Sequence, residues 1–203
     1  MSVSVVAVVP AAGESRRMGR PKLTLPIDGT PVITRLLRAL IDGGVEWTVV
    51  VGPPEDSPGW LEFVQAAGVD RSILTVSPPA RPPDMRSSVA LGVSVLARQG
   101  GPYDFVILAP ADSPGITASL VRSVISAAVE RPGKIVVPTV AGKRGHPVAL
   151  PWSVAMEVLT LPDGLGVNSL LARHASLVCE LPVDEPGAVV DLDTPEDYER
   201  WSR

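Results

Sequence analysis

The sequence is poor in cysteine and in long apolar runs, and these absences exclude two classes of protein. Cys179 is the only cysteine among 203 residues, so an intramolecular disulfide framework is excluded, and we interpret it as a small buried hydrophobe. No run approaches the roughly 18 apolar residues of a membrane span, and no charged segment precedes an apolar one as in a signal peptide. We therefore expect a cytoplasmic protein with no membrane partner.

An excess of basic charge is also missing. Lys and Arg number 18 against 22 Asp and Glu, which gives a formal net charge of -4, so a general affinity for nucleic acid is not expected. The chain is 45% hydrophobic and 20% charged, an ordinary globular balance that can bury a full core. Its length predicts a single domain over residues 1–203.

Strand and helix patterns alternate along the chain. Short apolar, β-branched runs predict strands over residues 3–9, 46–52, 72–76, 104–109, 134–139, 177–181 and 188–192. Helical spacing predicts helices over residues 31–42, 60–67, 85–98, 117–129, 151–159 and 166–173, and a last helix that opens at 193–197. This alternation predicts an α/β fold, with a doubly wound, mostly parallel sheet and helices on both of its faces.

A loop of small and basic residues follows the first predicted strand, at the edge where open α/β sheets bind their ligands. The small residues let a ligand approach the backbone closely, and the others bring a hydroxyl and four cations. The small residues are Ala11, Ala12, Gly13 and Gly19. The hydroxyl belongs to Ser15, and the cations are Arg16, Arg17, Arg20 and Lys22. Exposed N–H groups beside cations favour a polyphosphate site. The alternative is a solvated basic loop between a strand and a helix.

The loop differs from two widespread phosphate-binding loops. A Walker A loop has four residues between its glycines and then Gly-Lys-Ser/Thr, whereas five residues separate Gly13 from Gly19 here. The dinucleotide pattern Gly-x-Gly-x-x-Gly is absent. Instead, Ala-Ala-Gly-x-Ser-x-Arg-Met-Gly-x-Pro-Lys, from Ala11 to Lys22, resembles the signature of the molybdenum-cofactor-type nucleotidyltransferases. Within that family the motif is most similar to the cytidylyltransferases, although Pro10 stands where Leu is usual.

The resemblance implies a fold like that of the nucleotide-diphospho-sugar transferases, which is Rossmann-like. It implies that Arg17, Lys22 and Asp112 are catalytic. It also implies a nucleotide site made of Ala11, Ala12, Gly13, Glu14, Ser15, Met18, Gly19, Arg86 and Ser87. The last two belong to Asp84-Met85-Arg86-Ser87-Ser88, which is similar to the family's Gly-Met-Ser-Ser-Ser. A capped surface helix is the alternative for that segment.

Two acidic positions are candidates for a metal site. Asp112 follows the most apolar predicted strand, where a carboxylate can hold a hard divalent cation or can simply cap a turn. The family's Asp-x-Pro at this strand end, which resembles Asp112-Ser113-Pro114, implies magnesium there, although Ala111 replaces the usual Gly. Residues 191–197 match the family's Asp-x-Asp-Thr-Pro-Glu-Asp, so Asp193 becomes the expected second ligand. Asp191 remains open for that role, and a helix cap is the alternative for Asp193.

The side that binds the second substrate matches the family less well. Gly145-His146-Pro147-Val148 resembles the family's Gly-His-Pro-Val turn, which implies that Gly145, His146 and Pro147 bind this substrate. A lone His is more often a structural residue. Asn168 stands where relatives often carry Arg, and we assign it to the same site. The loss of that cation leaves the identity of the acceptor open.

These patterns together predict a magnesium-dependent nucleotidyltransferase. It would move a nucleoside monophosphate from a triphosphate to a phosphorylated small-molecule acceptor, for which the molybdopterin cofactor is one candidate. CTP is favoured because cytidylyl relatives carry Ala-Gly where Ala12-Gly13 stands, and relatives that use GTP carry two glycines. The alternatives are a non-catalytic nucleotide-binding module and a guanylyl or sugar-phosphate nucleotidyltransferase. A hydrolase with Ser15 as nucleophile is disfavoured, since Arg17 replaces the second glycine of Gly-x-Ser-x-Gly.

Overall fold

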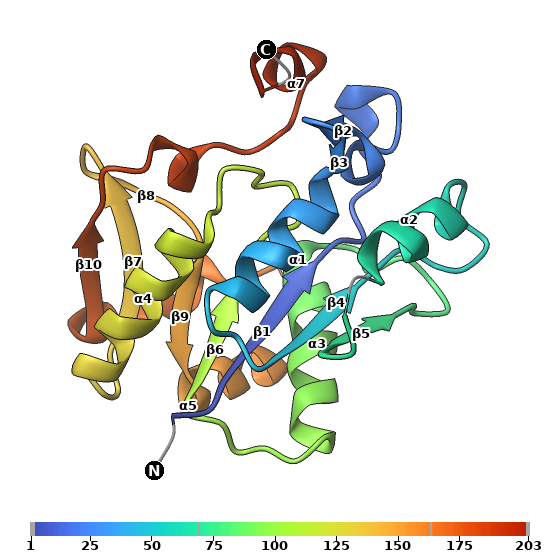
Figure 1. The fold of residues 1–203 in the computed structure, drawn as a ribbon. Coiled ribbons are helices and arrows are strands. Elements are labelled where there is room, and N and C mark those ends of the chain that lie inside the picture. Colours follow the sequence, from blue (N-terminus) through green and yellow to red (C-terminus); the bar gives the residue numbers. More distant parts are fainter. Residues whose placement is uncertain (1–2, 69, 163, 202–203) are drawn as a thin grey trace.

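The computed structural model describes residues 3–68, 70–162 and 164–201, and Figure 1 shows its fold. The strands are β1 (Val5–Pro10), β2 (Pro26–Ile27), β3 (Thr30–Pro31), β4 (Trp47–Val51), β5 (Ile73–Val76), β6 (Phe105–Leu108), β7 (Ile135–Val140), β8 (Lys143–Arg144), β9 (Val148–Pro151) and β10 (Val178–Pro182). The α-helices are α1 (Val32–Asp42), α2 (Trp60–Ala67), α3 (Met85–Arg98), α4 (Ala118–Glu130), α5 (Trp152–Met156), α6 (Asn168–Arg173) and α7 (Pro195–Trp201). Short 3-10 helices are η1 (Arg16–Met18), η2 (Lys22–Thr24), η3 (Glu157–Thr160), η4 (Ala175–Leu177) and η5 (Pro186–Val189). Among the helices of these residues, none has the length and apolar character to cross a membrane.

The main sheet has the strand order β10-β7-β9-β6-β1-β4-β5, and β8 pairs with β7. β1 lies between β6 and β4 and is parallel to both. β4 is parallel to β5, β7 is parallel to β10, and β9 runs antiparallel to β6 and β7. The predicted mostly parallel sheet is therefore confirmed. The chain winds outward in both directions from β1, so the carboxyl ends of β1 and β6 form a switch point where such folds bind ligands.

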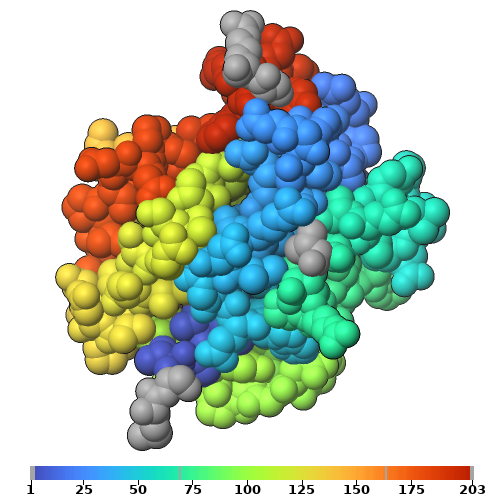
Figure 2. All heavy atoms as spheres, viewed as in Figure 1, coloured from blue at the N-terminus to red at the C-terminus, as the bar shows by residue number. Residues whose placement is uncertain are grey.

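Helices cover both faces of the sheet, as the alternation of patterns predicts. Along β1, Val5, Ala7 and Val9 face one core, which α1, α2 and α4 complete. Val6 and Val8 face a second core, which α3, α5 and α6 complete. Successive side chains of a strand point to opposite faces, and a strand buried on both sides is therefore apolar throughout. In Figure 2 the blue helix α1 and the yellow-green helix α4 lie side by side over the first face.

Most element boundaries agree with the sequence patterns. The helix predicted over 85–98 coincides with α3, and the one predicted over 31–42 is α1, one residue shorter. The strand β9 was not predicted. Its run Val148-Ala149-Leu150 is too short for its periodicity to separate it from the helix that follows.

The strand predicted over residues 188–192 is wrong. Residues 186–189 form η5 instead, and the backbone up to Leu192 joins no ladder of the sheet. Its polar groups bond to strand-end loops: Ala188 O accepts from His146 N at 2.7 Å, and Leu192 N donates to Asp112 O at 2.8 Å. In Figure 1 this red segment runs along the upper edge of the sheet from β10 to α7. The apolar residues that suggested a strand pack this segment against the core instead, and Ala188 and Leu192 are buried.

Candidate active site

A cleft of about 620 Å³ opens at the carboxyl ends of the central strands. Four segments form its walls: the loop after β1, the loop that leads into α3, the loop after β6, and the residues before α7. The lining residues are Pro10, Ala11, Ala12, Gly13, Glu14, Ser15, Arg16, Arg17, Lys22, Leu23, Arg81, Pro82, Pro83, Asp84, Met85, Ser88, Ala111, Asp112 and Asp193.

The loop after β1 presents a row of backbone donors to this cleft. The N–H group of Ala11 is bonded to Val51 O at 2.8 Å, but the N–H groups of residues 12–15 donate to nothing in the described parts of the chain. Ser15 has a left-handed backbone, with φ 52° and ψ 32°, and its side-chain oxygen accepts from Lys22 N at 3.2 Å. Consecutive unpaired N–H groups in such a turn form a concave site for an anion.

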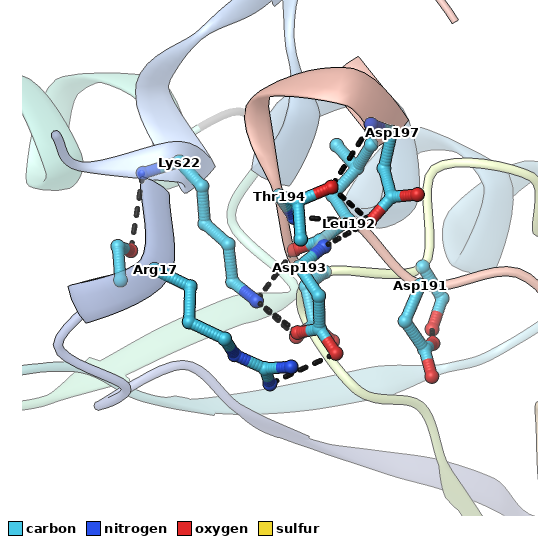
Figure 3. A network of polar contacts seen from close by, with 10 residues as sticks. Arg17, Lys22, Asp191, Leu192, Asp193, Thr194 and Asp197 are labelled. Carbon is cyan, nitrogen blue, oxygen red and sulfur yellow. Dashed lines mark hydrogen bonds and ion pairs between the residues drawn. The ribbon is translucent and has the colours of Figure 1, made fainter. Parts of the chain in front are cut away.

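Lys22 connects this loop to both acidic segments (Figure 3). Its Nζ donates to Asp112 Oδ2 at 2.5 Å, to Leu192 O at 2.6 Å and to Asp193 Oδ1 at 3.3 Å. The side chain is only 12% exposed, so these contacts are shielded from bulk water. Arg17 lies against the other oxygen of Asp193, Oδ2, at 3.0 Å. Two cations and two carboxylates, drawn from three distant segments, therefore meet in one place.

The acidic pair has the chemistry that a hard divalent cation requires. Asp112 and Asp193 both contact the same ammonium, so one small cation could reach both carboxylates. In the described residues no group of three or more His, Cys, Asp or Glu side chains could hold a metal. Two carboxylates alone suit magnesium, which commonly takes its other ligands from water and substrate phosphates. Asp191 makes a different contact, since its Oδ1 accepts from Ser113 Oγ at 2.7 Å.

The carboxylate of Asp193 is not used to cap α7, because another residue caps this helix. Thr194 Oγ1 accepts from Asp197 N at 3.2 Å, and Asp197 Oδ2 accepts from Thr194 N at 3.0 Å. This is a reciprocal capping box, which satisfies two backbone donors at the start of the helix. Thr194 Oγ1 also donates to Asp197 Oδ2 at 2.9 Å, and this side-chain hydrogen bond, together with the one from Thr194 N, lowers the pKa of Asp197. The alternative of Asp193 as the helix cap is therefore wrong, and Figure 3 shows its carboxylate directed toward Lys22 and Arg17.

Close backbone packing holds the segment that carries Asp193. A Cβ added to Gly145 would lie 2.1 Å from Ala188 O, and one added to Gly115 would lie 2.4 Å from the Cα of Gly187. Only glycine permits these approaches. Together with the hydrogen bond from Leu192 N to Asp112 O, they fix the C-terminal segment against the loop that carries Asp112.

A family model for the MobA-like NTP transferase domain matches residues 7–177, most of the chain. The chain belongs to this MobA-like NTP transferase family. The match includes the loop after β1, Lys22 and Asp112, and it ends before Asp193. Asp193 is therefore connected to the site by its contacts with Lys22 and Arg17.

The chain is similar to proteins named for two kinds of nucleotidyl transfer. The chain is 34% identical over 197 residues to the 2-C-methyl-D-erythritol 4-phosphate cytidylyltransferase of Saccharopolyspora erythraea, covering 92% of this chain and 85% of that one. It is 27% identical over 210 residues to the molybdenum cofactor guanylyltransferase of Rhizobium meliloti, covering 96% and 90%. The fold of Rv0371c from Mycobacterium tuberculosis H37Rv agrees with a TM-score of 0.78 at 26% identity, covering 100% and 99%. A complex of Rv0371c with manganese agrees with a TM-score of 0.72 at 25% identity, covering 98% of each chain.

Within this MobA-like domain, many of the sequence-predicted residues line the cleft and others do not. Those that line it are Ala11, Ala12, Gly13, Glu14, Ser15, Arg17, Lys22, Asp112 and Asp193. Met18 is buried below the loop, and Gly19 ends η1 with φ 65°. Arg86 lies in the first turn of α3, where its Nη1 donates to Leu161 O at 3.4 Å, and Ser87 N donates to Asp84 Oδ1 at 2.7 Å.

The residues expected to bind the acceptor lie outside the lining of the cleft. Gly145, His146 and Pro147 precede β9, and the first two contact the C-terminal segment at Ala188. His146 Nδ1 is buried without a hydrogen-bond partner among the described residues. Burial lowers the pKa of the His146 imidazole, and the negative charges of Asp191 and Asp112 oppose this shift. Asn168 is exposed at the start of α6.

The sequence analysis missed one wall of the cleft. Arg81, Pro82, Pro83, Asp84, Met85 and Ser88 form it, and only the neighbouring Arg86 and Ser87 were assigned to the nucleotide site. Asp84 caps α3 by accepting from Ser87 N. The side-chain hydrogen bond with Ser87 is the main cause of the lowered pKa of Asp84, and the bond from Ser87 N adds to it. A signal was present, because a proline-rich segment with one cation follows a predicted parallel strand at the ligand-binding edge.

Proposed function

We propose that this protein transfers a nucleoside monophosphate from a nucleoside triphosphate to a phosphorylated small-molecule acceptor and releases pyrophosphate. The observation that carries the proposal is the convergence of Lys22, Asp112 and Asp193 beside the unpaired N–H groups of residues 12–15. An anion cradle beside two carboxylates is suited to a triphosphate with its metal. Membership of the MobA-like NTP transferase family supports the same reaction class.

The proposed reaction is a direct in-line displacement. A phosphate oxygen of the acceptor attacks the α-phosphorus, the bond from this phosphorus to the bridging oxygen breaks, and pyrophosphate leaves with that electron pair. Because the attacking oxygen is already ionised, the chain need not supply a strong general base. Its tasks are to align the two substrates and to stabilise the developing charge.

Each charged residue has a defined part in this proposal. The N–H groups of residues 12–15 bind the triphosphate tail, while Lys22 and Arg17 stabilise charge on the α-phosphate and on the departing pyrophosphate. Lys22 now contacts Asp112 and Asp193, so it must turn from these carboxylates to reach a phosphate. Asp112 and Asp193 would hold a divalent cation, which we take to be magnesium and which would neutralise phosphate charge. A manganese complex of the similar Rv0371c supports a divalent cation as part of this proposal.

We further propose CTP as the nucleotide. Ala12 lines the cleft and is only 6% exposed, so its methyl group takes up space beside the loop backbone. A pyrimidine can leave that space free, whereas a purine that approaches the backbone cannot. The similar cytidylyltransferase of Saccharopolyspora erythraea is consistent with this choice. The acceptor is a phosphorylated small molecule, with the molybdopterin cofactor as one candidate, and Gly145, His146, Pro147 and Asn168 stay proposed for its side of the site.

The proposal includes a single domain over residues 1–203 that works in the cytoplasm.

The proposed nucleotidyl transfer is tested by measuring pyrophosphate release from CTP, GTP, ATP and UTP, each paired with a panel of phosphorylated sugars, polyols and pterins in the presence of magnesium. We expect turnover with CTP and at least one acceptor, and none without the acceptor. Triphosphate binding without pyrophosphate release for any pair would favour a non-catalytic nucleotide-binding module.

A further inference from the structure

Arg81 joins three loops at the rim of the cleft. Its Nη1 donates to Ala12 O, its Nη2 donates to Ser57 Oγ at 3.3 Å, and its Nε lies 3.5 Å from Glu14 Oε1. These partners belong to the loops after β1 and β4, and Arg81 belongs to the loop after β5. The three strands are neighbours in the sheet, so their carboxyl-end loops meet at one guanidinium.

The loop that carries Arg81 is stiff and anchored. Four of the seven residues from 77 to 83 are proline, which restricts the backbone and removes N–H donors. Ser77 Oγ donates to Pro53 O at 2.5 Å, which ties the start of this loop to the loop after β4. The Arg81 side chain is 28% exposed, so its contacts are partly shielded from solvent. Because this loop is rigid, Arg81 can hold the carbonyl of Ala12 in a fixed position.

The contact with Ala12 O determines how the proposed phosphate loop, residues 11–22 after β1, is oriented. In a trans peptide the carbonyl of one residue and the N–H of the next point in opposite directions in one plane. A guanidinium that holds Ala12 O therefore also sets the direction of the Gly13 N–H, one of the unpaired donors of the cradle. The neighbouring Glu14 carboxylate is held between Arg81 and Arg16, which keeps its negative charge at a fixed place on the loop.

We infer that Arg81 is a positioning residue for triphosphate binding, acting through the peptide between Ala12 and Gly13. This inference rests on the proposed function. Arg81 has a planar group with several donors, and lysine offers one compact ammonium that cannot bridge the same three acceptors. Loss of the bridge lets the loop sample orientations in which the N–H groups diverge, and triphosphate affinity falls while binding of the acceptor is unaffected.

The test compares Arg81→Ala, Arg81→Lys and a matched control, Arg35→Ala. Arg35 is also a half-buried arginine that donates to a backbone carbonyl, Ile27 O, and pairs with an aspartate, but it lies on α1 away from the cleft lining. CTP affinity is measured by calorimetry with magnesium. We expect Arg81→Ala and Arg81→Lys to bind CTP on the order of tenfold to a hundredfold more weakly, as for lost hydrogen bonds to a charged group. The KM for CTP should rise accordingly, with the acceptor KM unchanged and Arg35→Ala equal to the parent.

A second measurement does not depend on any nucleotide. Trypsin cleavage after Arg16 and Arg17 reports how often the phosphate loop opens, since cleavage follows the population of open states. We expect these sites to be cut faster in Arg81→Ala than in the parent or in Arg35→Ala, with global melting temperatures close together. Should Arg81→Ala not fold, Arg81→Lys gives the same comparison.

The outcomes separate this inference from the proposed function. Parent-like CTP affinity in Arg81→Ala, or full rescue by Arg81→Lys, would overturn the positioning role, since rescue would mean that positive charge alone matters. A parent protein that binds no triphosphate would contradict the proposed function. The cleavage rates would then still decide whether Arg81 orders the loop, and unchanged cleavage in Arg81→Ala would overturn the inference as well.

Discussion

Replacing Lys22 by alanine should cost the protein both activity and stability. The Nζ contacts two carboxylates and a carbonyl within 3.3 Å, and the side chain is 12% exposed. The sequence alone suggests an exposed loop residue, whose truncation changes stability by no more than about 0.5 kcal/mol. The structure overturns that expectation, because Lys22→Ala leaves Asp112 and Asp193 facing each other without their shared cation.

The stability loss follows from the contacts. Hydrogen bonds to charged groups contribute about 1.5–3 kcal/mol, and we expect a loss of that order for Lys22→Ala. For a chain of this length that corresponds to a melting temperature lower by about 3 to 12 °C. The catalytic loss should be larger, since removal of a preorganised donor to developing charge lowers kcat by about a hundredfold to a thousandfold.

Two assays on the same preparations check this prediction. Thermal unfolding followed by circular dichroism gives the stability change, and pyrophosphate release at saturating substrate gives kcat. Lys134→Ala is the matched control. Lys134 Nζ also donates to a backbone carbonyl, Ser176 O at 3.0 Å, but Lys134 precedes β7 and so lies at the edge of the sheet opposite the acidic pair. It should resemble the parent in both assays. A Lys22→Ala variant with parent kcat would remove Lys22 from the mechanism, and one with parent stability would refute the reasoning from its contacts.

Three further predictions concern the metal pair, the nucleobase and the C-terminal segment. Asp112→Asn and Asp193→Asn should each raise the magnesium concentration needed for half-maximal turnover, since each removes one anionic ligand and leaves only a neutral amide oxygen; two parent-like titrations would exclude the pair as a metal site. Ala12→Gly should shift the ratio of kcat/KM for CTP and GTP toward GTP by roughly tenfold to two-hundredfold, and an unchanged ratio would remove this methyl group from base selection. Gly145→Ala should lower the melting temperature and kcat together, because its Cβ would overlap a carbonyl of the segment that carries Asp193. Gly166→Ala, which meets no atom within 4 Å, should do neither, and equal behaviour of the two variants would contradict the packing argument.

The sequence predicted the architecture well because local patterns decide it. β1 is apolar at every position from Val5 to Val9, as burial on both faces requires. The apolar spacing of α3 and its cap, Asp84, both lie within one continuous stretch of sequence. Where a segment is held by distant contacts, local patterns fail. The residues around Ala188 look like a strand, but their backbone bonds to His146 and Asp112 instead of to a ladder.

The same contrast applies to the candidate site. The loop from Ala11 to Lys22 and the two aspartates could be found by motif, since each lies at a strand end or before a helix. The ion pairs of Lys22 could not, because they join residues 90 and 171 positions apart. Arg81 was missed for a similar reason. Its partners belong to other loops, and only the folded sheet brings them to one guanidinium.

The most direct test of the proposed function follows the α-phosphate itself. The protein is incubated with magnesium, a phosphorylated acceptor that supports pyrophosphate release, and CTP labelled at either the α- or the γ-phosphate. The account predicts that the α-label enters the acceptor product and that the γ-label leaves in pyrophosphate, with both transfers slowed in Asp112→Asn at a magnesium concentration that saturates the parent. Release of the γ-label as inorganic phosphate would indicate hydrolysis of the triphosphate, and its appearance in the acceptor would indicate a kinase reaction. Either result, with no α-label in the product, would contradict nucleotidyl transfer.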